Sequence, residues 1–148
     1  MVEITQYVLL YLVSAVAIGA VAWYAYSHRK ELNEMCCMMM GMTFGGAAAL
    51  AVSAIYALDT GDFVWSMILG TVAGYAVGVP MGRMGGPLGR MEAVFAAPGA
   101  AFMGGMLSIM AKLYDVKLYT IFLMLVVFSL MGEMAYVIHK TVKEYHSA

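Results

Sequence analysis

Charged residues are scarce in this chain of 148 residues: Asp, Glu, Lys and Arg make up 11%, against 64% hydrophobic residues, and the mean hydropathy is +0.84. A typical soluble domain has about 25% charged and about 45–50% apolar residues. A globule of this size exposes too large a share of its area to hide so much apolar surface. The composition therefore excludes a soluble enzyme and predicts an integral membrane protein.

An excess of basic charge is also missing, since the formal net charge is −1. Without a basic stripe to bind phosphates, we expect no nucleic-acid partner. The sequence contains no converging nucleophile, base and acid and no phosphate-binding loop after a strand, so we expect no enzymatic activity. The chain has only two cysteines, Cys36 and Cys37. Because adjacent cysteines meet disulfide geometry poorly, they are interpreted as two thiols in a reducing or metal-handling environment.

Five apolar stretches approach the length of about 20 residues that a bilayer-spanning helix needs. Nearly all charges lie in the connections between these stretches or at the chain ends. We therefore predict an all-α membrane protein, a single polytopic domain over residues 1–148 packed through Gly and Ala. The alternative has four spans, with the fourth stretch re-entrant, because Pro98 and Gly99 weaken it. The predicted spans are residues 5–26, 36–58, 63–81, 93–111 and 118–139.

Basic residues divide unequally between the two sides of the five-span arrangement. One side carries Arg29, Lys30, Arg83, Arg90, Lys140 and Lys143, and the other carries Lys112 and Lys117. Cytoplasmic loops are enriched in Lys and Arg. The pattern predicts an external N-terminus and a cytoplasmic C-terminus, in the inner or plasma membrane. The first span is expected to stay in the mature protein, because Glu3 and no basic residue precedes it.

Small residues recur at every fourth position in the middle three spans. Such spacing lets two helix backbones approach closely, which is how helices associate in lipid. We expect these spans to form the centre of a monomer or homo-oligomer; the alternative is that the glycines line a path or permit a conformational shift. The predicted packing positions are Gly41, Gly45, Gly70, Gly74, Gly78 and Gly105, with Ala49, Ala97 and Ala101 in the same stripes.

Methionine is the most unusual component, with 16 copies, five of them within residues 35–42. Thioether and thiolate sulfur are soft donors that select Cu(I) over hard cations. Ordinary helix packing is the alternative interpretation, because methionine fills irregular gaps. The five-span arrangement brings most of the clustered methionines to the cytoplasmic half of the membrane. The predicted soft-metal ligands are Met35, Cys36, Cys37, Met38, Met39, Met42, Met81, Met84, Met131 and Met134.

Two short resemblances accompany these motifs. The pairs Met38–Met42 and Met106–Met110, beside the Gly70–Gly74 spacing, are similar to elements of the high-affinity copper importers of the Ctr type. Those proteins form trimers of three-span chains around a Met-lined pore. The vicinal Cys36–Cys37 pair resembles the paired thiols of bacterial mercury-uptake membrane proteins. Both resemblances imply handling of a soft metal ion, and each covers only a few residues.

Glu133 is the one charged residue well inside a predicted span. A carboxylate there is expensive, so we expect either an ion pair with Arg83 or Arg90, or a role in moving protons or ions. Two functions stay open at this point. The first is a small membrane protein that binds or transports a soft metal ion, most readily Cu(I). The second is an accessory subunit of a larger membrane complex, in which the glycines and methionines serve helix packing.

Overall fold

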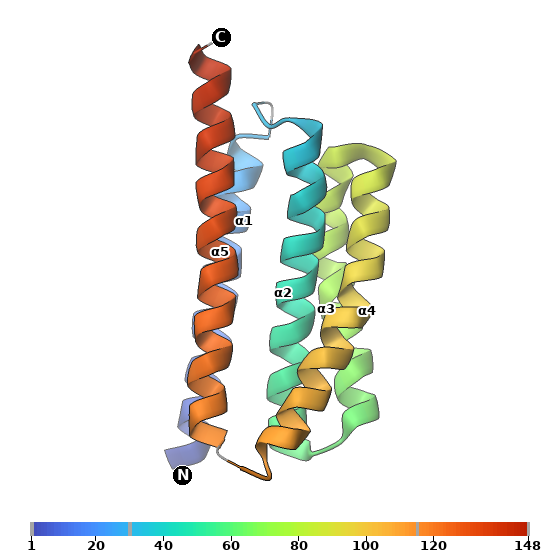
Figure 1. The fold of residues 1–148 in the computed structure, drawn as a ribbon, viewed down its shortest axis with the longest axis vertical. Coiled ribbons are helices and arrows are strands. Elements are labelled where there is room, and N and C mark those ends of the chain that lie inside the picture. Colours follow the sequence, from blue (N-terminus) through green and yellow to red (C-terminus); the bar gives the residue numbers. More distant parts are fainter. Residues whose placement is uncertain (1, 30, 115, 148) are drawn as a thin grey trace.

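The computed structural model describes residues 2–29, 31–114 and 116–147, with side chains described from Leu12 onward. Every regular element in these ranges is a helix, which confirms the predicted all-helical class. The elements follow one another up and down along the long axis of the molecule (Figure 1). In chain order they are α1 (Val2–Ser27), α2 (Glu34–Thr60), α3 (Phe63–Gly82), the short 3₁₀ helix η1 (Arg83–Gly85), α4 (Gly86–Ala111) and α5 (Val116–Ser147).

Three helical stretches are long and apolar enough to cross a membrane: Glu34–Thr60, Phe63–Ala111 and Val116–Ser147. The second stretch contains α3, η1 and α4, and a shorter apolar helix covers Leu12–Ser27. α4 runs without a break past Pro98. Five separate crossings therefore remain a prediction, which the helix arrangement in Figure 1 accommodates.

Local sequence explains the tight connection between α2 and α3. Gly61 ends α2 with a φ of 77°, in the left-handed region that glycine tolerates best. Asp62 then caps α3, because its side-chain oxygen accepts hydrogen bonds from the backbone N–H groups of Val64 and Trp65. These two residues reverse the chain between α2 and α3.

The connection between α3 and α4 is shorter than the sequence suggests. The predicted fourth span begins at Ala93, whereas α4 begins at Gly86, directly after η1. Pro87 lies in the first turn of α4, where its missing N–H costs nothing and its fixed φ suits a helix. Residues 82–92, which are rich in Gly and contain Pro87, thus mostly form the start of α4.

Helices α2, α3 and α4 form a closely packed group, which we call the three-helix unit (Figure 1). Small residues form the buried stripes of α3 and of α4 within this unit. On α3 the buried positions are Ser66, Gly70, Gly74, Gly78 and Gly82, which is one stripe at four-residue spacing. The facing stripe of α4 includes Gly89, Ala93, Ala97, Ala101 and Gly105.

Several glycines of the three-helix unit lie too close to a neighbouring backbone to carry a side chain. A Cβ added to Gly78 would lie 2.6 Å from the Cα of Gly45 and 2.9 Å from the Gly41 carbonyl oxygen. At the turn end, a Cβ on Gly82 would collide with the backbone carbonyl of Gly89, and the reverse is equally true. Glycine is therefore required where α3 turns into α4.

Helices α1 and α5 lie side by side along α2 and contact it less extensively (Figure 1). Their contacts with α2 use larger side chains, including Ile18, Phe44, Val127 and Ile138 in one buried cluster. Near the connection from α4 to α5, the hydroxyl groups of Ser108 on α4 and Tyr119 on α5 form a 3.0 Å hydrogen bond. This bond links the three-helix unit to α5.

Candidate metal centre

The start of α2, the turn from α3 into α4 and the end of α5 all lie at one end of the molecule (Figure 1). The connection from α1 to α2 lies at the same end, while the N-terminus and the other two connections lie at the opposite end. The basic residues assigned to the cytoplasmic side thus belong to segments at one end, although Lys30 lies outside the described residues. The clustered methionines at the start of α2 and in η1 belong to this end as well.

Sulfur side chains from α2 and α5 belong to one buried cluster between α1, α2 and α5. Cys36 and Cys37 are free thiols that are 5% and 2% exposed. We use the name sulfur cluster for the two thiols together with the thioethers of this core and of its edge. The buried thioethers are Met40, Met131 and Met134, and the half-buried Met81 and Met84 pack against the cluster from its edge.

Helical spacing explains why these residues share one buried core. Cys36, Met40, Phe44 and Ala47 follow one another at intervals of three or four residues on the face of α2 that is buried in this cluster. Met131 and Met134 continue the buried stripe of α5 that includes Val127 and Ile138. α2 therefore supplies both thiols and one thioether, and α5 supplies two thioethers.

Two further contacts position the thiols. Gly85 of η1 lies directly against Cys37, since a Cβ added there would be 3.1 Å from the Cβ of Cys37. The side chain of Thr141 on α5 lies beside Cys36. Thr141 donates its own hydroxyl hydrogen to the Val137 carbonyl oxygen at 2.9 Å.

The predicted ligands divide into two groups in the structure. Six of them lie in or against the sulfur cluster, namely Cys36, Cys37, Met81, Met84, Met131 and Met134. Met35, Met39 and Met42 instead project from the exposed side of α2, with Met35 70% exposed, and Met38 is half-buried. Met40 is fully buried in the cluster; it is not among the predicted ligands, although helical spacing pairs it with Cys36.

The chemistry of this cluster is that of soft donors. Among the described residues, no group of three or more His, Cys, Asp and Glu side chains is arranged to hold a metal ion. A metal ion at this place would therefore draw on methionine sulfur in addition to the two thiols. Thiolate and thioether ligands together favour Cu(I) and similar soft ions.

Glu133 lies on the exposed side of α5, away from the sulfur cluster. Arg83 and Arg90 are exposed as well. The ion pairs of the described residues join Lys140 with Glu144 and His146 with Glu31, and none joins Glu133 to either arginine. The suggested ion-pair or proton role of these three residues stays a prediction.

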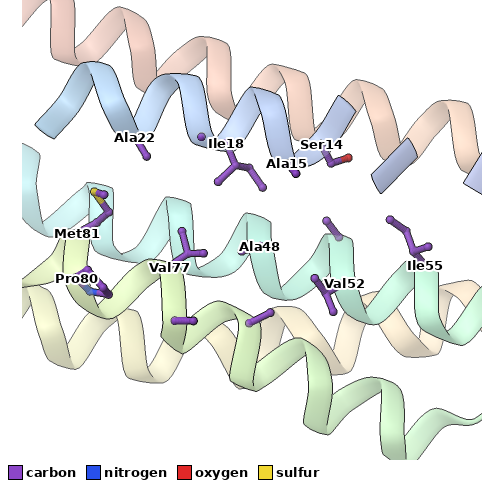
Figure 2. A pocket seen from close by; sticks show the side chains of 14 residues that line it. Ser14, Ala15, Ile18, Ala22, Ala48, Val52, Ile55, Val77, Pro80 and Met81 are labelled. Carbon is purple, nitrogen blue, oxygen red and sulfur yellow. The ribbon is translucent and has the colours of Figure 1, made fainter. Parts of the chain in front are cut away.

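An apolar groove runs between α1, α2 and α3, with a volume of about 460 Å³. Figure 2 shows its lining, with Ile18 and Ala22 of α1 facing Ala48 and Val77 across the groove. Ser14 and Met81 are the polar hydroxyl and the sulfur among its labelled side chains (Figure 2). Since Met81 also packs against the sulfur cluster, the groove reaches the edge of that cluster.

No protein-family model, curated protein or solved structure matches this chain. Its function is therefore argued from the geometry and the chemistry of the sulfur cluster.

Proposed function

We propose that this chain is a small integral membrane protein that binds a soft metal ion, most readily Cu(I), in the sulfur cluster. Transport of that ion would use the same site. The observation that carries the proposal is that two free thiols and three thioethers belong to one buried core, supplied by helices far apart in the sequence. Cu(I) accepts two or three sulfur ligands, and this core offers more than that number.

Burial of the thiols also supports the proposal. A buried soft site excludes water and hard ligands, and it protects Cu(I) and the thiols from oxidation. Met81 and Met84 at the edge provide additional thioethers from the end of α3 and from η1. The two cysteines are the ligands that we expect to contribute most, because thiolate binds soft ions through its charge as well as its polarisability.

The membrane arrangement belongs to the same proposal. With five crossings and a cytoplasmic C-terminus, the sulfur cluster lies in the cytoplasmic half of the inner or plasma membrane. The reducing cytoplasm keeps Cys36 and Cys37 as thiols. The lipid bilayer would cover the exposed apolar faces of α4 and α5, which carry Phe95, Phe102 and Leu125.

Titration with Cu(I) under reducing, oxygen-free conditions tests the proposal, with a coloured Cu(I) chelator as competitor. We expect purified protein in detergent to take at least one ion per chain. Replacing both thiols, Cys36→Ser with Cys37→Ser, should lower the affinity by more than about 100-fold, since second-shell changes alone cost 10–100-fold. Replacing Met131 and Met134 by Leu preserves side-chain volume and should lower it by about 10-fold, or about 1.4 kcal/mol.

The matched control is Met103→Leu with Met106→Leu, because both methionines are exposed on α4 and outside the sulfur cluster. This variant should bind Cu(I) as the wild type does. If the wild type takes no more Cu(I) than the variant without thiols, the proposal is wrong.

The second candidate function is an accessory subunit of a larger membrane complex or a homo-oligomer. The observation that favours it is the row of exposed methionines along α4, which includes Met91, Met103, Met106 and Met110. Exposed methionine adapts to varied partner surfaces. Co-purification with a larger complex from native membranes would support this function, and isolation as a homogeneous monomer without bound metal would contradict both candidates.

A further inference from the structure

Any ion that binds in the sulfur cluster must reach groups that have almost no contact with the surface. Cys37 and Met40 lie against neighbouring helices, and Cys36 is similarly buried. Leu32, however, packs against the buried core that contains Cys36, and it also lines an open pocket at the surface. Thr141, which lies beside Cys36, lines the same pocket. Cys36 is therefore the thiol that this pocket approaches.

This surface pocket lies between the connection from α1 to α2 and the last turns of α5. Its volume is about 380 Å³. The connection contributes Glu31, Leu32 and Asn33, and α5 contributes Thr141, Glu144 and Tyr145. Two carboxylates, an amide and two hydroxyl groups make its wall polar, in contrast to the apolar groove of Figure 2.

One oxygen atom in the wall of this pocket lacks the hydrogen bond that a buried oxygen normally accepts. The Oε2 oxygen of Glu31 is buried and has no hydrogen-bond partner among the described residues. Nδ1 of His146 lies 3.9 Å from it, and that nitrogen lies only 3.0 Å from the Val142 carbonyl oxygen. A buried carboxylate oxygen without a partner favours a water molecule or a cation beside it.

We propose that the surface pocket is the entrance through which cations reach the sulfur cluster, with Glu31 attracting them and Thr141 marking its inner end. This inference rests on the proposed function. Binding of Cu(I) to Cys36 replaces the S–H bond by a sulfur–copper bond and releases one proton, which leaves through the same polar pocket. The apolar groove offers an ion no comparable set of oxygen donors.

Thiol labelling tests the entrance without any metal. The protein carries Cys37→Ser, so that Cys36 is the one reactive thiol, and it is treated in detergent with a small, permanently cationic methanethiosulfonate reagent. Thr141→Trp fills the inner end of the pocket and should slow labelling of Cys36 by at least 10-fold. Thr141→Val removes the hydroxyl group without filling the pocket and should not slow it.

Thr120 provides the matched control, because its hydroxyl also bonds the carbonyl four residues earlier, near the other end of α5. Thr120→Trp should leave the labelling rate unchanged. Equal labelling rates of Cys36 with the native threonines, with Thr141→Trp and with Thr120→Trp would show that the surface pocket is not the entrance.

Glu31→Gln removes the negative charge but keeps the shape of the side chain. It therefore tests whether the charge of Glu31 attracts cations to the pocket. It should slow the cationic reagent several-fold and leave an uncharged reagent of similar size unaffected. An unchanged ratio of the two rates would overturn the role of Glu31. Labelling that follows these expectations in a protein that binds no Cu(I) would disprove the proposed function while leaving the entrance in place.

Discussion

The two sides of helix α2 are packed by opposite means. Toward α3 and α4 it presents Gly41, Gly45 and Ala49, and the helix backbones lie nearly in contact. Toward α1 and α5 it presents the bulkier Cys36, Met40 and Phe44, which fill a wider space between the helices.

The difference teaches how one helix can serve two purposes. Backbone-to-backbone packing leaves no room for adjustment, because any added atom meets a carbonyl group rather than a flexible side chain. Methionine side chains have three rotatable bonds and can rearrange around a guest. The three-helix unit is thus the rigid support, and the sulfur cluster lies on its adaptable side.

The largest expected effect comes from breaking the rigid side at Gly82. Gly82→Leu would drive a side chain into the backbone of Gly89, so we expect the protein not to fold. Ordinary overpacking already costs about 1–3 kcal/mol, and here the obstacle is backbone. Size-exclusion chromatography after detergent extraction should show aggregated protein or none.

Gly132→Ala is the control, since a Cβ there meets nothing within 4 Å. It should leave the elution profile and thermal stability unchanged. A well-folded Gly82→Leu protein would show that the backbones of α3 and α4 do not approach as described.

On the adaptable side the sharpest test is Phe44→Ala. Phe44 is fully buried in the cluster with the thiols, and its removal opens a cavity. Substitutions of this kind cost about 3–5 kcal/mol. The thermal midpoint in detergent should therefore fall by on the order of 10 °C. A loss as severe as that of Gly82→Leu would mean that the two sides of α2 are equally intolerant.

The smallest expected effect concerns the link between the two regions. Ser108→Ala removes the hydrogen bond to Tyr119 and should cost about 1 kcal/mol or less, as hydrogen bonds between membrane helices usually do. Combining it with Tyr119→Phe in a double-mutant cycle isolates the pair. Strictly additive losses would show that the two hydroxyl groups contribute no coupling energy.

Much of the helical layout could be predicted from hydropathy, because apolar runs mark where a chain can enter a bilayer. The start of α4 at Gly86 could not be predicted, since Gly and Pro usually interrupt helices. Pro87 is compatible with α4 only because it lies in the first turn of that helix. The end of α5 at Ser147 was also missed, because its last turns are polar and hydropathy reports membrane extent rather than helix length.

The types of residue that form the candidate site could be predicted from the sequence, but only some of the particular residues could. Helical spacing places Cys36 and Met40 together, yet it cannot tell which side of α2 faces another helix. Met35, Met39 and Met42 share a face by spacing, and that face is exposed. The Thr141 contact with Cys36 depends on how α5 lies beside α2, and no local pattern encodes it.

The position of the two thiols within α2 has an electrical consequence. α2 begins at Glu34, so Cys36 and Cys37 both lie in its first turn. A Cu(I) ion held by two thiolates would form a complex with a net charge of −1. The amino end of a helix carries about half a positive elementary charge from its aligned peptide dipoles. The positive amino end of α2 would therefore offset part of the negative charge of the complex between Cu(I) and the two thiolates.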